Sequence, residues 1–377
     1  MATPDLHTWI TGTQLDIECS ATIRDTGTVV VTGVPVTGTL TLARPATVVR
    51  TADVTFQTLT PKALAAGLDS GWTADLQVRV RQGAETHTVP LGRFRAISTS
   101  WNPGAPAVAA QLTDELTLVV DDRFKYPVTM RKGMTYFEAI RRVLAILGIT
   151  PAGQTLATIA TDTTWGPIPT AAIRVPLTED RERAELFELL NQRIGTQTLF
   201  DKTGVLTMRC DPAVYYRKAA NRTGADYRLP DAAAFRVDDV AFNREDQYNA
   251  LVIQPGESDE NFWYSWRPLT TGPYAYGARF GAKPQFYSSD LLHTRALAEN
   301  AIAGMLPDYT STARRLAVSA PPYWWIEAGN VIALPGPAAA PPRYVINAVS
   351  LPLGLGDMAL ELESVDIEQF EVPEYGA

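Results

Sequence analysis

The sequence is poor in the residues on which most catalytic and metal sites depend. Only two cysteines, Cys19 and Cys210, are present, too few for a framework of disulfides. The three histidines, His7, His87 and His293, lie in different segments and in no spacing typical of a zinc site. We therefore expect ordinary half-buried thiols, structural histidines, and no metal or other cofactor.

Nucleotide-binding and hydrolase motifs are also missing. The sequence contains no P-loop and no G-x-S-x-G elbow. Residues 354–359 match G-x-G-x-x-A, but the stretch that follows is short and alternates like a strand, so we interpret the match as a hairpin turn. The acidic pairs 121–122, 238–239 and 259–260 point to opposite sides of an extended chain, which does not suit an acid–base pair. These absences predict a protein without enzymatic activity.

Long apolar runs and basic blocks are absent as well. No apolar run reaches the roughly 18 residues of a membrane-spanning helix, and the first residues lack a signal-peptide pattern, so we expect neither a membrane span nor a secretion signal. Acidic residues outnumber basic ones by 41 to 33, for a formal charge of −8. This excess of acidic residues argues against a basic face that binds nucleic acid phosphates. It permits a channel through which nucleic acid passes without being bound.

What the chain does contain is strand-like alternation. Its 377 residues are 46% hydrophobic, enough for at least two cores. In residues 1–122, runs that alternate apolar and polar side chains are separated by turn residues about every ten positions. The predicted strands include 28–31, 39–42, 48–56 and 75–80, and the predicted turns include Gly33 and Gly38. This spacing is typical of an antiparallel barrel or sandwich.

The pattern becomes helical after Pro127. Thr135 and Glu138 form a capping box that starts a helix, and Gly148 can end it. A second helix is predicted from Thr178 to Gly195, after a turn-rich connector over 151–176. A hairpin with strands 196–200 and 205–209 follows it directly.

Strands return near residue 234 and are interrupted by an aromatic segment. The predicted strands are 234–242, 248–254, 315–319, 330–334 and a closing hairpin of 343–349 with 358–365, and a third helix is predicted over 290–306. Between them, residues 261–287 are unusually rich in aromatic side chains. Trp and Tyr concentrate at protein interfaces, stack on sugar rings, and also fill local cores, and all three uses stay open. We take a subunit interface as the first interpretation, with the following candidate residues: Trp263, Tyr264, Trp266, Tyr274, Tyr276, Trp324 and Trp325.

The order of these pieces resembles the tail hub proteins of tailed bacteriophages, the baseplate hub or minor tail protein family whose trimers cap the tail tube. The matching stretches are a β-rich module that ends with 116–122, the helix 136–148, the segment 186–208, the strand that starts at Tyr248-Asn249, and the strand 326–334. The resemblance covers most of the chain through its arrangement and short hydrophobic patterns.

The resemblance implies a β-rich α+β fold, in which two tube-like antiparallel β-barrel domains carry two inserted α+β domains. The first barrel would comprise residues 1–122 and the second 235–258 with 312–369. The insertions would be 123–234 and an aromatic-rich helical segment, 259–311, with 370–377 as a tail.

The resemblance also implies function and partners. The chain would be a structural virion component of the phage tail, assembled in the host cytoplasm: a homotrimer that joins the sixfold tail tube or distal tail proteins to the threefold tail tip and fibre proteins. It would surround the channel, and DNA would pass through the lumen during genome ejection without specific binding. A receptor- or carbohydrate-binding tail tip protein and a hydrolase of cell-wall polymer are the alternatives.

Overall fold

A computed structural model of the whole chain shows how these segments are arranged. The structure describes the following residues: 15–25, 27–44, 48–59, 72–82, 84–102, 104–145, 159–173, 176–179, 182–217, 224–229, 235–242, 248–255, 264–270, 274–289, 295, 298–299, 302, 305, 314–334 and 342–365. The predicted tail 370–377 and the histidines His7 and His293 lie outside them.

A twelve-stranded sheet dominates the fold. Its main path runs β1-β4-β5-β6-β3-β2-β19-β20-β17-β13, with β18 and β12 branching from β19. The strands of the N-terminal half are β1 (Leu15–Asp25), β2 (Thr28–Ala43), β3 (Arg50–Gln57), β4 (Thr73–Gln82), β5 (Glu85–Trp101) and β6 (Ala107–Thr113). Those of the C-terminal half are β12 (Tyr227–Arg228), β13 (Arg236–Phe242), β17 (Arg314–Ala320), β18 (Val331–Ala333), β19 (Arg343–Pro352) and β20 (Met358–Ser364).

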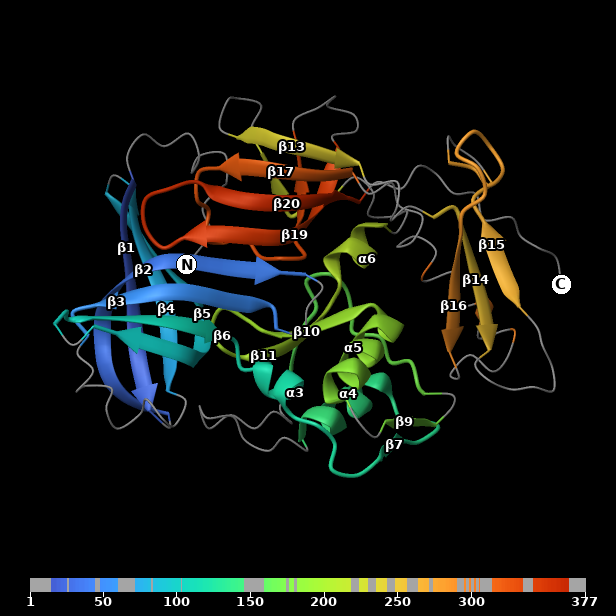
Figure 1. Ribbon diagram of the computed structural model, residues 1–377, viewed down its shortest axis with the longest axis horizontal. Coiled ribbons are helices and arrows are strands. Elements are labelled where there is room, and N and C mark those ends of the chain that lie inside the picture. Colours follow the sequence, from blue (N-terminus) through green and yellow to red (C-terminus); the bar gives the residue numbers. More distant parts are fainter. Residues whose placement is uncertain are drawn as a thin grey trace.

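The six N-terminal strands close on themselves. Besides its neighbour β4, strand β1 also pairs with β2, so the antiparallel path β1-β4-β5-β6-β3-β2 returns to its start. The alternation read from the sequence sets this arrangement, because one side of each strand is buried. Strand β3, for example, buries Ala52, Val54 and Phe56 and exposes Thr51 and Asp53. The ring of strands lies at one end of the molecule (Figure 1).

Two glycines predicted as turns lie inside one long strand. Gly33 and Gly38 have φ of 68° and 140°, yet β2 continues through both of them. At Gly38 a Cβ atom would stand 2.1 Å from the carbonyl oxygen of Asp53 on β3. Glycine is needed here for close approach of two backbones, so the predicted turns and the separation of 28–31 from 39–42 are wrong.

The C-terminal strands continue the same sheet. Strand β19 pairs with β2 and with β20, which confirms the predicted closing hairpin and makes residues 354–356 part of its turn. The two predicted β-modules are therefore not separate sheets. Among the described residues β13 pairs with β17 alone, so the described pairings do not close a second ring.

An α+β insertion packs beside the sheet around a core of its own. It contains the helices α3 (Thr117–Asp121), α4 (Tyr136–Ala145), α5 (Arg183–Ile194) and α6 (Pro212–Arg217) and the strands β7 (Val128–Met130), β8 (Ala160–Asp162), β9 (Leu177–Glu179), β10 (Thr196–Phe200) and β11 (Leu206–Cys210). Helix α4 buries Ile140 and Leu144 against Leu186 and Phe187 of α5. The capping box is confirmed: the Glu138 carboxylate accepts from the Thr135 amide at 2.9 Å, and the Thr135 hydroxyl accepts from the Glu138 amide at 3.1 Å.

Three local features of this insertion differ from the predictions. Residues 117–121, expected to end the first β-rich module, form helix α3. Thr178, expected to start the second helix, pairs as part of β9 with β7, and α5 begins at Arg183. The connector 151–176 contains strand β8, which pairs in parallel with β11. Tertiary pairing decides each short segment, because its own pattern is too brief to select helix or strand.

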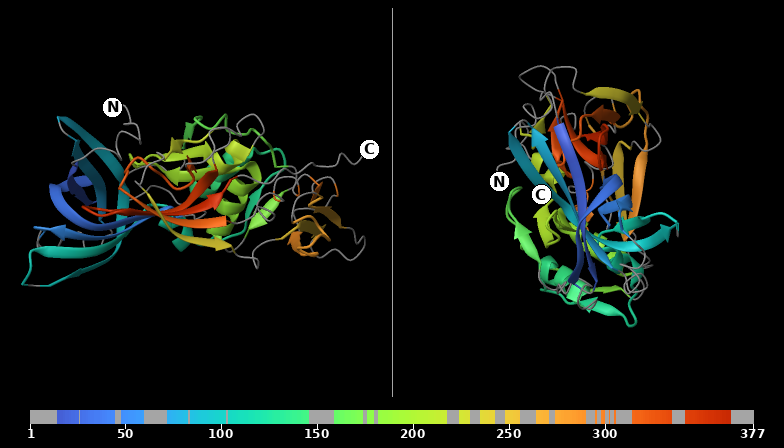
Figure 2. Two further views of the ribbon diagram at one scale, coloured as in Figure 1. Left: turned by 90° about the horizontal axis from the view of Figure 1, so that it is seen from above. Right: turned by 90° about the vertical axis from the view of Figure 1, so that its left-hand side faces the viewer.

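A separate three-stranded sheet holds the aromatic segment. Strand β14 (Ala250–Pro255) lies between β15 (Ser265–Pro268) and β16 (Pro284–Ser289). We expected β14 in the second barrel and a helical segment after it; β14 instead pairs only with β15 and β16 among the described strands. Most of the predicted helix 290–306 lies outside the described residues, but Ala298 and Ile302 are helical and pack on Leu251 and Ile253. This sheet lies at the opposite end of the molecule from the strand ring (Figures 1 and 2).

Candidate functional site

The structure divides the predicted interface residues into two groups. Tyr264, Trp266 and Tyr276 are exposed at the three-stranded sheet, where Tyr274 is partly exposed. The Trp266 and Tyr276 rings meet edge to face with centroids 5.4 Å apart. Trp263 lies outside the described residues. Trp324, by contrast, is fully buried in the core of the large sheet, which is the local-core use left open above, and Trp325 is half-buried beside it.

One aromatic row crosses the whole three-stranded sheet. Val252 of β14 is paired with Trp266 of β15 and with Phe286 of β16, so the three side chains share one face. Trp266 is 47% exposed and Phe286 is 64% exposed. The other face is covered, because Leu251 and Ile253 are buried against Ala298 and Ile302. Phe286 was not among the predicted site residues, although it lies in the aromatic-rich segment 261–287.

A charged junction, centred on Glu327, joins three parts of the chain. Glu327 lies in the turn between β17 and β18, and its carboxylate contacts Arg50 of the strand ring at 3.0 Å. From the insertion, Arg209 of β11 approaches it to 3.1 Å and Lys202 of the β10–β11 turn to 3.7 Å. All four side chains are largely or fully buried. Sequence reasoning missed this cluster, although Arg50 is in phase with the buried residues of β3.

The cations of the junction also donate hydrogen bonds to backbone carbonyl oxygens. Arg50 donates to the carbonyl oxygens of Phe200, at 3.1 Å, and Leu91, at 3.2 Å. Lys202 donates to the carbonyl oxygens of Trp324 and Trp325. Charge-assisted hydrogen bonds of this kind are about twice as strong as neutral ones. The junction therefore holds the insertion, the ring and the β17–β18 turn in one arrangement.

Electrostatics in the junction shift two ionisable groups. Burial by itself raises the pKa of the Glu327 carboxyl, but Arg50, Lys202 and Arg209 reverse the effect and lower it to about 2. Burial lowers the pKa of Lys202 to about 8, and Arg50 and Arg209 act in the same direction while Glu327 opposes them. Glu327 is thus a fixed anion at neutral pH, suited to hold cations rather than to exchange protons.

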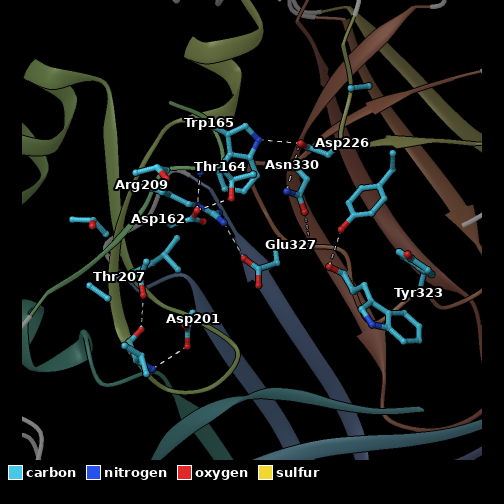
Figure 3. A pocket seen from close by; sticks show the side chains of 18 of the residues that line it. Asp162, Thr164, Trp165, Asp201, Thr207, Arg209, Asp226, Tyr323, Glu327 and Asn330 are labelled. Carbon is cyan, nitrogen blue, oxygen red and sulfur yellow. Dashed lines mark hydrogen bonds and ion pairs between the residues drawn. The ribbon is translucent and has the colours of Figure 1, made fainter. Parts of the chain in front are cut away.

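A cleft of about 1090 Å³ lies beside the junction, between the insertion and the large sheet. Figure 3 shows Glu327 and Arg209 in its wall, with Asp201 and Thr207 to one side and Tyr323 to the other. On the wall near β12, Asp226 accepts hydrogen bonds from the Trp165 indole at 2.9 Å, the Tyr216 hydroxyl at 2.7 Å and the Val331 amide at 2.7 Å. Burial and Asp226 raise the pKa of Tyr216 above its usual range.

The uncovered face of the large sheet carries short polar side chains. One cross-strand row runs from β17 through β20, β19 and β2 to β3 and consists of Ser319, Ala359, Ser350, Thr41 and Thr51. The neighbouring row consists of Pro352, Thr39, Asp53, Gln111 and Ser98. These positions hold no large aromatic or basic side chain, but the first row continues on β13 with Arg236, which lies opposite Ser319, is exposed and pairs with Asp238. The two rows are therefore rich in hydroxyl groups, with a basic side chain at their β13 end.

The cysteines and the described histidine do not form a cluster. Cys19 is buried in the strand ring and Cys210 is partly buried at the end of β11, so they do not meet. His87 lies on β5. Within the part of the chain that the structure describes, no group of three or more His, Cys, Asp or Glu is placed to hold a metal ion. No helix among the described residues is long and apolar enough to cross a membrane.

The chain has the fold of bacteriophage tail proteins, as the resemblance predicted. It is similar to the 43 kDa tail protein of prophage MuSo2 from Shewanella oneidensis, with 11% identity over 92% of this chain and 98% of that chain and a TM-score of 0.57. It is also similar to the tail protein from Neisseria meningitidis MC58, with 11% identity, 92% and 96% coverage and a TM-score of 0.58. Comparison of the sequence with protein-family models and with curated proteins found no match.

A chain of a solved protein complex from Francisella has a similar fold. A chain of the Francisella PdpA-VgrG complex matches with 10% identity over 97% of this chain and a TM-score of 0.54. The match spans only 55% of that longer chain. The fold is thus shared between phage tail proteins and a chain of the PdpA-VgrG complex.

Proposed function

We propose that this protein is a structural, non-enzymatic component of a phage-type tail, and specifically a trimeric hub that joins the sixfold tube to the threefold tip. Six-strand rings are suited to this task, because ring-shaped modules repeated around a threefold axis can present a matching rim to a tube. Strands β1 to β6 would supply one tube-like barrel, and β13 with β17 to β20 a second one that closes on assembly. The virion would be its location and tail tube and tip proteins its partners.

The observation that carries this proposal is the continuous sheet from the strand ring to β13. Its uncovered face presents Thr41, Thr51 and Ser350 on three neighbouring strands, with Asp53 and Glu361 as nearby acids. A channel wall of this kind offers few cations to DNA phosphates, because the exposed Arg236 at its β13 end is already paired with Asp238. DNA would therefore pass through the lumen without specific binding.

The aromatic row supports a subunit contact. Monomeric proteins rarely expose large contiguous apolar patches, and aromatic side chains, above all Trp and Tyr, concentrate at interface hot spots. We assign Trp266, Tyr264, Tyr276 and Phe286 to contacts with a neighbouring subunit or tail protein. The edge of β13 that no described strand covers is a second point of contact, since an open edge favours pairing with another chain.

Mass measurement tests the proposed trimer. Purified full-length protein, examined by native mass spectrometry and then by electron microscopy with its tail tube protein, should give a threefold particle with a central hole. Trp266→Ala should weaken assembly, whereas Trp101→Ala, which removes a ring of similar exposure (45%) from the strand ring, should not. A chain that stays monomeric in the mature particle would refute the hub.

The second candidate function is a carbohydrate-binding tail tip protein. The same exposed aromatic row favours it, because flat rings with polar neighbours suit sugar stacking. Titration with host surface polysaccharide would then change tryptophan fluorescence, and Trp266→Ala would abolish the change. A cell-wall hydrolase would instead release sugar or peptide fragments and lose that activity on a single carboxylate change.

A further inference from the structure

The cleft beside the charged junction has two strand edges in its walls. Strand β8 contributes Ala160, Thr161 and Asp162, and strand β12 contributes Tyr227 and Arg228. Among the described strands, β8 pairs only with β11 and β12 pairs only with β18. Each strand therefore has one edge that no described strand covers, and both strands border the same space.

The backbone of β12 is oriented to use its free edge. The Leu229 amide donates to the Ala333 carbonyl oxygen, toward β18. Successive residues of a strand direct their N–H and C=O groups to opposite sides, so the peptide groups of Arg228 point away from β18. An extended segment that enters the cleft can pair with such groups, as happens when a peptide adds a strand to a sheet edge.

Two acidic side chains of the cleft favour a positively charged ligand. Asp162 accepts from Thr164 at Oδ1, and Asp201 accepts from Thr203 and Val205 at Oδ1. In both carboxylates the described hydrogen bonds leave Oδ2 for another partner. Glu327 is already held by three cations, whereas Asp162 and Asp201 have no ion-pair partner among the described salt bridges. Partly exposed Tyr227 and Trp325 add aromatic surface on which a cation can lie.

We propose that this cleft binds an extended polypeptide segment of a partner protein, which pairs with a free edge of β8 or β12 and places a Lys or Arg side chain beside Asp162 and Asp201. The cleft volume of about 1090 Å³ is at the upper end of small-ligand sites, so it accommodates several residues of a strand. The site is separate from the aromatic row and does not require the proposed trimer.

Peptide selection tests the proposal. The full-length protein is screened against a displayed library of random 12-residue peptides, and the selected peptides are synthesised and measured by fluorescence polarisation. We expect enrichment of Lys or Arg within strand-forming sequences. Asp162→Asn and Asp201→Asn should each weaken binding roughly tenfold, because asparagine keeps an Oδ1 acceptor for the turn and removes the charge.

Two further variants make the result decisive. Ala160→Trp fills the cleft at an exposed position and should abolish binding, while Glu361→Gln, a charge removal on the sheet face, should leave the affinity within about twofold. Circular dichroism and thermal unfolding confirm that each variant is folded. Selection of no peptide, of peptides without basic residues, or of peptides that still bind Ala160→Trp would overturn the proposal. Because the oligomeric state is measured separately, loss of the trimer with peptide binding intact would overturn only the hub.

Discussion

Replacement of Glu327 by glutamine is the sharpest test of the charged junction. The change keeps the shape and one acceptor oxygen but leaves Arg50, Arg209 and Lys202 buried without their counter-charge. Removal of one partner of a buried ion pair typically costs about 3 to 5 kcal/mol. The pKa of Glu327 falls from 4.5 to about 2 on folding, which independently corresponds to about 3 kcal/mol of stabilisation at pH 7.

The pH dependence of this loss has a definite sign. Because the folded pKa of Glu327 is depressed, its stabilisation is present above pH 4.5 and is lost as the pH falls through about 2. The difference in unfolding free energy between wild type and Glu327→Gln should therefore shrink from about 3 kcal/mol at pH 7 to about 2 kcal/mol at pH 3.5.

Urea unfolding followed by circular dichroism measures this difference. Glu361→Gln serves as the control, since Glu361 is exposed on β20 and its replacement should change stability by less than about 0.5 kcal/mol. The reasoning is refuted if Glu327→Gln costs less than about 1 kcal/mol at pH 7, or if the difference grows as the pH falls.

Three further predictions concern packing and reactivity. Leu144→Ala should destabilise the protein by about 2 to 5 kcal/mol, because Leu144 is fully buried in the insertion core, and a loss within urea-titration error would contradict this placement. Gly38→Ala should abolish or strongly reduce soluble folded protein, because its Cβ would collide with Asp53, whereas Gly354→Ala, at a similar φ of 153° with nothing within 4 Å, should cost far less; equal effects in thermal unfolding would count against the close approach. Burial raises the pKa of Cys19 to about 12, so iodoacetamide at pH 8 should modify Cys19 only after denaturation, as mass spectrometry of the tryptic peptides would reveal.

Local patterns predicted much of the fold. The capping box of α4, the β10–β11 hairpin and the β19–β20 hairpin occur where the sequence placed them. Each depends on signals within a few residues: a side chain that bonds the adjacent backbone, or alternation on both sides of a turn. The composition also identified the aromatic-rich segment, in which the structure leaves Trp266 exposed.

Predictions failed where contacts between segments far apart in the sequence determine the local structure or the strand pairing. Residues 117–121 and 177–179 are too short for their own patterns to choose between helix and strand. The sequence of strand β14 has the apolar pattern of any buried strand. No residue near it in the sequence indicates that β15 and β16 are its neighbours. Trp324 and Tyr264 are both aromatic residues in aromatic-rich stretches, yet one is buried and the other exposed.

The sequence by itself determined the β-rich class, the position of the insertion, the absence of familiar catalytic motifs and the likeness to tail hubs. Only the tertiary structure decided that the strand ring and the later strands share one sheet, through the pairing of β2 with β19. It also decided that Arg50 meets Glu327, 277 positions further along the chain. Alternation and capping are local, but a buried charge is stable only where folding brings its partners, and no local pattern specifies that meeting.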